Sequence, residues 1–164
     1  MEHGLAGDPG WAGVLEASAL GMMMRESLFL YPLANLVHLL GLSLLIAPIG
    51  LLDLRLLGFG RVVSVPDASR LLTPWTAAGL FLLIASGLML FSADAGPLVA
   101  TDVFQLKMLL LALNLANVAV FRFLWRGHLQ DWDRRPPLIG RLQAVLSLAG
   151  WLLIGSLGRL IAYG

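Results

Sequence analysis

Long apolar runs separated by short polar segments dominate the chain. Four of these runs are long enough for a membrane span, which needs about 20 mostly apolar residues in a helix. Each run ends at turn-forming or charged residues, and the second contains no charged side chain. The pattern predicts an all-α fold, a four-helix transmembrane up-down bundle formed by residues 27–164. Its spans are expected at about 27–50, 73–92, 103–123 and 142–162.

The segment before the first span is apolar but too short to cross a membrane. Its larger apolar residues recur at roughly helical spacing, which favours a helix lying on the outer membrane surface. Residues 1–26 are therefore expected to form an outer tail with an interfacial helix. Glu2 and Asp8 stand where a secretory signal would carry Lys or Arg, so we expect no signal cleavage. The recurring residues are Trp11, Val14, Leu15, Ala19 and Met22.

Composition supports a membrane protein and excludes several kinds of site. The 164 residues are 59% hydrophobic and 13% charged, whereas soluble proteins are about one quarter charged. With 11 basic and 10 acidic residues, the chain has no overall field to attract nucleic acid, and we expect the lipid bilayer as its main partner. Cysteine is absent, which excludes disulfides, thiolate metal sites and covalently attached c-type haem.

Lys and Arg side chains concentrate in two of the segments that connect the predicted helices. Cytoplasmic loops of membrane proteins carry an excess of these residues. We therefore predict a multi-pass protein of the cell membrane, with both basic loops cytoplasmic and both termini extracellular or periplasmic. Eight basic residues support this orientation, namely Arg55, Arg61, Arg70, Arg122, Arg126, Arg134, Arg135 and Arg141, against Arg25, Lys107 and Arg159 at the opposite side.

A layer of polar residues is expected inside the membrane. Asn35 and His38 are three positions apart and share one face of the first helix, while Lys107 and Asn114 are seven apart and share a face of the third. At about 1.5 Å of rise per residue, Asn35 and Lys107 fall in the outer third of the membrane, and His38 and Asn114 fall near its middle. We expect the two pairs to meet between the first and third spans. Tyr31 extends the first stripe towards the outer surface.

Two interpretations of this layer are open. His38 is either a neutral imidazole bonded to a neighbouring helix, for example through Asn114, or an axial ligand to the iron of a b-type haem. A bond of the first kind contributes about 0.6 kcal/mol. Lys107 either extends its ammonium group to the outer interface or offers its charge to a haem propionate or a quinone oxygen. In the haem interpretation Asn114 orients the imidazole ring.

The sequence does not provide a complete haem or catalytic site. His3 lies in the outer tail and His128 in a basic loop, so a haem would be held by His38 alone, by His38 from two subunits, or by His38 with Lys107 or Met89. No complete catalytic motif occurs, and enzymatic activity stays undecided.

Asp53 and Arg55 stand at the predicted cytoplasmic end of the first helix. We expect them to form a local ion pair that fixes the helix end, a contribution of about 0–1 kcal/mol. No carboxylate falls inside any of the four predicted spans.

Several short strings give the chain a family resemblance. It resembles a bacterial family of small four-helix membrane proteins, the domain of unknown function 6644 family, over about residues 19–163. The resemblance implies the fold and topology but no activity, and the family's pattern often has Glu where Asn35 stands. The chain is also loosely similar to four-helix cytochrome b and copper-resistance membrane proteins, which place histidines inside a bundle. The strings are Arg25-Glu26-Ser27, Tyr31-Pro32 followed by His38, DLRLLG at 53–58, Lys107 with Asn114, and Gly158-Arg159.

Three classes of function remain as hypotheses. The leading one is a redox-linked membrane subunit that binds b-type haem, or contacts a quinone, through His38. The alternative is a non-enzymatic structural or assembly subunit of a larger membrane complex, whose polar layer only holds helices together. The third is a transporter or metal-ion conduit, for which the sequence offers only the Met22–Met24 cluster. A homo-oligomer is compatible with all three.

Overall fold

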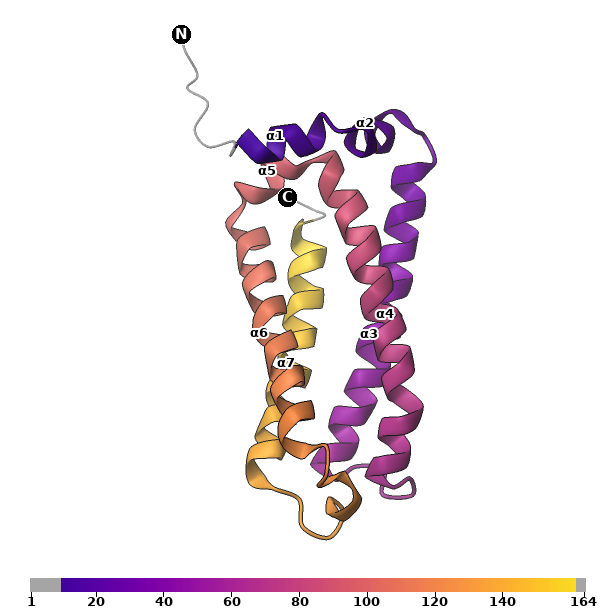
Figure 1. The fold of residues 1–164 in the computed structure, drawn as a ribbon, viewed down its shortest axis with the longest axis vertical. Coiled ribbons are helices and arrows are strands. Elements are labelled where there is room, and N and C mark those ends of the chain that lie inside the picture. The colour runs from indigo at the N-terminus through magenta and orange to yellow at the C-terminus, as the bar shows by residue number, and fades with distance from the viewer. Residues whose placement is uncertain (1–9, 162–164) are drawn as a thin grey trace.

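A computed structural model describes residues 10–161 of the chain, with side chains described as far as residue 158. The described part is helical, and its helices form a tall bundle with a layer of short helices across one end (Figure 1). In chain order the elements are α1 (Gly10–Glu16), α2 (Ala19–Glu26), α3 (Leu30–Leu57), α4 (Val65–Ala93), α5 (Ala95–Val99), α6 (Asp102–Trp125), the short 3₁₀ helix η1 (Leu129–Asp131) and α7 (Leu138–Ile161).

The four long helices confirm the predicted fold. Helices α3, α4, α6 and α7 are long and apolar enough to cross a membrane, and they run alternately up and down the bundle (Figure 1). At the basic end they extend beyond the predicted windows, because α3 continues to Leu57 and α4 already begins at Val65. The sequence windows stopped at charged residues, but the structure buries Asp53 and Arg55, so these charges do not end the helix.

The bundle is built from two helix pairs. Helix α3 packs most extensively on α4, helix α6 packs on α7, and the α3–α7 contact joins the pairs. Gly41 and Gly79 let the backbones of α3 and α4 come close together. A Cβ atom on Gly79 would lie 2.5 Å from the backbone nitrogen of Leu45, nearer than atoms can approach. Small residues permit such close packing of membrane helices, which depends on dispersion contacts between them.

Three apolar clusters lie at different heights, and the one under the short helices contains Met24, Ala34 and Ala93. The middle one contains Leu45 and Ile49 of α3 with Trp151 and Ile154 of α7. The one near the basic end contains Leu56, Val65, Trp132 and Ala144. Most other large apolar side chains of the long helices point outward and are exposed, which suits contact with lipid hydrocarbon.

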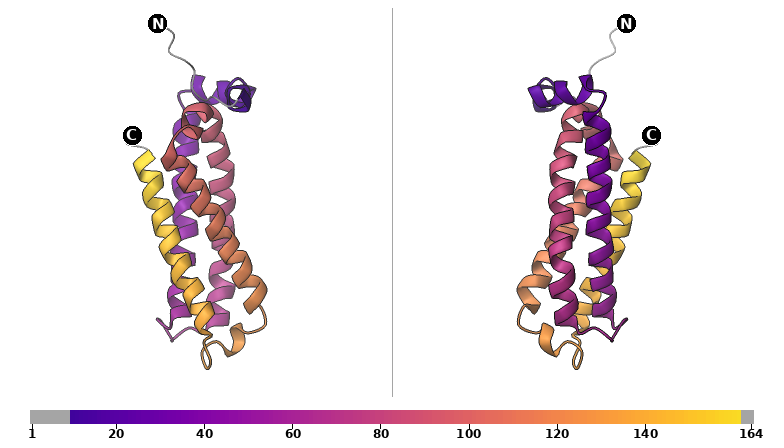
Figure 2. Two further views of the ribbon diagram at one scale, coloured as in Figure 1. Left: turned by 90° about the vertical axis from the view of Figure 1, so that its left-hand side faces the viewer. Right: turned by 90° about the vertical axis from the view of Figure 1, so that its right-hand side faces the viewer.

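The predicted interfacial segment forms two helices instead of one. Helix α2 begins after Ser18, whose side chain accepts a hydrogen bond from the Gly21 backbone N–H. Together α1 and α2 lie across the end of the bundle (Figure 2). Arg25 holds this layer in place by donating to the carbonyls of Ala93, at 2.9 Å, and Glu16, at 2.6 Å. Residues 1–9 of the predicted outer tail, including His3, lie outside the described residues.

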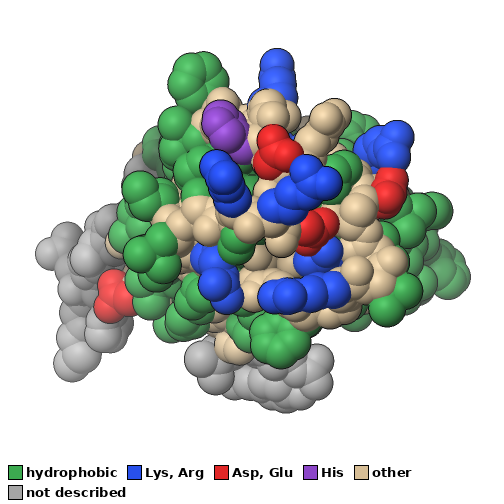
Figure 3. All heavy atoms as spheres, turned by 90° about the horizontal axis from the view of Figure 1, so that it is seen from below, with side chains coloured by type: hydrophobic (Ala, Val, Ile, Leu, Met, Phe, Trp, Pro, Cys, Tyr) green, Lys and Arg blue, Asp and Glu red, His purple; other side chains and the backbone are tan. Residues whose placement is uncertain are grey.

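The basic end is closed by an ion pair between distant segments. Arg55 pairs with Asp133, 78 residues later in the chain, and Asp133 also accepts from the backbone N–H of Val65 at 3.2 Å. The predicted local pair of Asp53 with Arg55 is therefore wrong. Residues two apart on a helix do not face each other, so Asp53 and Arg55 point in different directions. Lys and Arg side chains gather over this end face (Figure 3).

We predict that Gly79→Ala destabilises the bundle by about 1–3 kcal/mol, because the added methyl group pushes α4 away from α3. Thermal unfolding in detergent would show a lower midpoint. The control is Ala78→Leu, at a neighbouring position whose side chain is exposed, and it should unfold like the wild type. A Gly79→Ala variant with an unchanged midpoint would contradict the close approach of the two helices.

We also predict that Asp133→Asn destabilises the fold by about 3 kcal/mol, because it leaves the Arg55 charge buried without its partner. The same unfolding measurement checks it. Asp67→Asn is a matched control, since Asp67 pairs with Arg70 on the surface, where both side chains are exposed. Equal stability of the two variants would show that the Arg55 pair has no special role.

Candidate functional site

His38 of α3 is bonded to the neighbouring helix α4. Its Nδ1 atom lies 3.0 Å from the Ser86 hydroxyl oxygen, and that hydroxyl donates its own hydrogen to the Leu82 carbonyl at 2.6 Å. A hydroxyl has a single hydrogen to donate, so Nδ1 must be the donor in the bond to Ser86. The neutral ring then has its lone pair on Nε2, an assignment made from the hydrogen-bond network. The His38 ring packs over Gly87.

The structure does not place Asn35 and Tyr31 with His38 in one interior layer. Both side chains are exposed. The buried line of α3 runs through Ala34, Gly41 and Leu45, and Asn35 is turned about 100° from Ala34 around the helix. The three-residue spacing places Asn35 and His38 on neighbouring sides of α3. The packing of α3 on α4 half-buries His38 but leaves Asn35 exposed.

Asn114 and Lys107 of α6 face α7. Asn114 is buried, and its carboxamide lies against α7, where Nδ2 is 3.3 Å from the Ser147 carbonyl oxygen. With the carboxamide turned over, its oxygen accepts from the indole Nε1 of Trp151 at 3.2 Å and from the Trp151 backbone N–H at 3.1 Å. Asn114 therefore contacts α7 and His38 contacts α4, in place of the expected contact between the two residues.

Lys107 is half-buried and lies near the start of α6, whereas the second basic loop follows the end of that helix. Its ammonium nitrogen is near Gly158 of α7, 3.6 Å from where a Cβ atom would stand. Lys107 and His38 are both half-buried, and the hydrogen bonds and ion pairs of the described residues do not join them.

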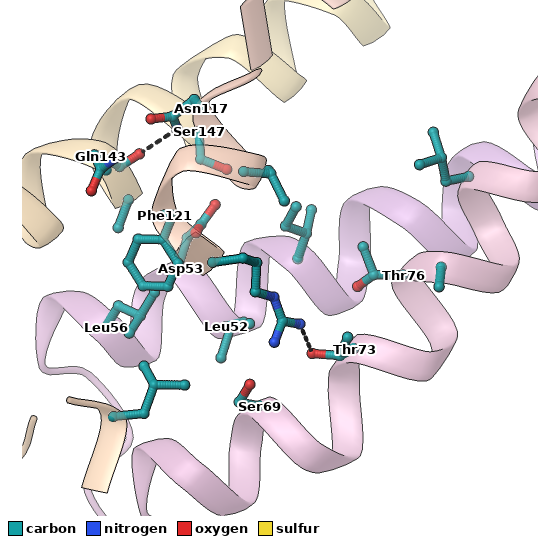
Figure 4. Close-up of a pocket in the computed structure, with 17 residues that line it drawn as sticks. Leu52, Asp53, Leu56, Ser69, Thr73, Thr76, Asn117, Phe121, Gln143 and Ser147 are labelled. Carbon is teal, nitrogen blue, oxygen red and sulfur yellow. Dashed lines mark hydrogen bonds between the residues drawn. The ribbon is translucent and has the colours of Figure 1, made fainter. Parts of the chain in front are cut away.

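A second polar region lies in the basic half of the bundle. A cavity of about 230 Å³ separates the α3–α4 pair from the α6–α7 pair. Figure 4 shows polar side chains on its walls, including Asp53 of α3, Thr73 of α4 and Ser147 of α7. Arg122 of α6 also lines it and donates to the Thr73 hydroxyl.

Asp53 is the most unusual of these lining residues. It is only 5% exposed. Its Oδ2 atom and the neighbouring Ser147 hydroxyl make no hydrogen bond of normal geometry within the described residues. An unpaired buried polar group of this kind is rare, since leaving it unsatisfied costs about 1–3 kcal/mol, and more when it is charged.

Sequence reasoning missed this cavity because it placed Asp53 beyond the end of the first span. A signal was available in the spacing. Asp53 follows the buried residues Leu45 and Ile49 at four-residue intervals and precedes Leu56 by three, which puts it on the interior face of α3.

No protein-family model matches the chain, and no curated protein or solved structure matches it.

Proposed function

We propose that the chain is a redox-linked membrane subunit that binds a b-type haem, or contacts a quinone, through Nε2 of His38. The hydrogen-bond relay from His38 through Ser86 to the Leu82 carbonyl carries this proposal. Histidines that bind metals commonly donate their other ring N–H to a fixed acceptor, which sets the tautomer and the ring orientation. Ser86 is such an acceptor, and it takes the orienting role expected of Asn114.

Lys107 supports the same proposal by its charge. It is a cation half-buried within a span, and ionisable residues inside membrane segments are costly and commonly functional. A haem propionate or a quinone oxygen would be stabilised by its ammonium group. The second axial position of a haem would be filled by His38 of a second copy, by Met89 or by Lys107 itself. Asn35 and Tyr31 are exposed and receive no role.

We expect protein purified from haem-replete cells to show a Soret band that shifts on reduction and is lost in His38→Ala. Absorption spectra of the oxidised and reduced protein check this. His128→Ala is the matched control, because His128 is an exposed loop residue, and it should keep the band. Ser86→Ala should keep part of the haem and weaken its retention, since the ring loses its fixed acceptor; second-shell losses of this kind are about 10–100-fold in affinity.

A colourless protein that also fails to bind a quinone in a His38-dependent way would overturn the proposal. The alternative, a structural or assembly subunit, would then be favoured. That alternative predicts that the protein co-purifies with a larger complex and that the His38→Gln variant still does so.

We further propose that the end with the basic loops faces the cytoplasm. Eight of the 11 Lys and Arg residues lie at that end, and positive charge in short loops sets the orientation of membrane proteins.

The absence of cysteine from the chain permits a direct test of orientation. We expect a single cysteine at Ala100→Cys to react with a membrane-impermeant maleimide in intact cells, and one at Gly127→Cys to react only after permeabilisation. Both positions are exposed and lie in connecting segments at opposite ends of the bundle. The reverse labelling pattern would invert the orientation.

A further inference from the structure

The cavity between the helix pairs has the features of a binding site separate from His38. Oδ2 of Asp53 and Oγ of Ser147 are both buried and make no hydrogen bond of normal geometry within the described residues, although the two side chains lie close to each other. Both residues line the cavity (Figure 4). Buried polar groups normally have partners. The Asp53 oxygen can therefore accept a hydrogen bond from a ligand that carries an O–H or N–H donor.

The size of the cavity suits an aromatic ring with substituents. Its volume is about 230 Å³, and an engineered apolar cavity of about 150 Å³ is already large enough to bind benzene. Apolar side chains form much of the wall, among them Leu52, Leu80 and Phe121. Phe121 offers a ring face for stacking or edge contact with such a ligand.

The charges on the walls favour a neutral ligand with two polar ends. Arg122, carried by α6 of the opposite helix pair, disfavours a cation, and the buried Asp53 carboxyl group offers an anion no favourable partner. The ion pairs of the described residues do not join Asp53 to Arg122, so both groups can bond to a ligand. A guanidinium has five N–H donors, and one Arg122 nitrogen donates to Thr73. A ligand that bonds to both groups therefore needs a donor for Asp53 and an acceptor for Arg122.

We propose that this cavity binds the ring of a bilayer-soluble quinol, with one hydroxyl donating to Asp53 and the other oxygen accepting from Arg122. A simple phenol would hydrogen-bond to only one of the two groups, and a protonated amine would be repelled by the Arg122 charge. The cavity lies beside the last turns of α3 and the first turns of α4, within the spans, where a hydrophobic ligand dissolved in the membrane is concentrated. This site does not depend on the proposed role of His38.

The test is an anaerobic titration with a para-benzoquinol that carries a short alkyl chain, and with its oxidised quinone. Tryptophan fluorescence reports binding, because the Trp132 ring centre is 5.6 Å from that of Phe121 on the cavity wall. The quinol should bind about tenfold more tightly than the quinone or better, since only the quinol has a hydrogen to donate to Asp53. Carrying out the titration in a His38→Gln background removes any quinone contact at His38, so this proposal and the proposed function can fail separately.

Variants of the two walls should give different results. Asp53→Asn removes the preference for the quinol, because a carboxamide can donate to the quinone oxygen, whereas the exposed loop variant Asp131→Asn keeps it. Arg122→Gln weakens the binding of both forms, since both carry an oxygen at that end. Thermal unfolding confirms that each variant folds. Three results would each overturn the proposal: equal affinity for the two forms, an unchanged preference in Asp53→Asn, or binding of phenethylamine in place of the quinol.

Discussion

Hydrocarbon provides no hydrogen-bond partners, so each polar group inside the four spans must be satisfied by the protein itself. This constraint explains the contacts of several interior side chains. His38 is joined to Ser86, Asn114 to the backbone of α7, and Arg55 to Asp133. The first two contacts also fix how two helices lie against each other, which apolar contact between helices does only weakly. The third joins the end of α3 to the loop before α7.

The same contacts divide the bundle into two pairs of helices. Gly41 and Gly79 bring α3 and α4 together, and the space that Gly150 leaves allows Asn114 to reach the backbone of α7. Where the pairs face each other in the basic half, the packing is incomplete and the cavity remains. Asp53 lies at this seam, and it is the interior carboxylate for which the described residues provide no full set of partners.

Two polar regions at different depths then offer different chemistry. His38 presents a lone pair on Nε2, which is fixed by a neutral hydrogen-bond relay through Ser86. The cavity has the carboxyl group of Asp53 and the guanidinium of Arg122 among its lining groups. The first suits an iron ligand or an acceptor for a hydroxyl, and the second suits a neutral molecule with two polar ends. A redox-linked membrane subunit would use both regions.

The sequence by itself determined the fold class and the four spans, because the length of an apolar run reflects the thickness of the membrane and needs no knowledge of neighbours. It also placed His38 and Lys107 within the spans, where the structure has both side chains half-buried. Only the tertiary structure decided which helix each polar side chain meets: His38 meets α4, Asn114 meets α7, and Arg55 meets a loop 78 residues away. Depth along a helix can be counted from the sequence, but the rotation of each helix and the choice of its neighbour arise from close packing between distant segments. For that reason the burial of Asp53 and the cavity beside it emerged only when the helices were assembled.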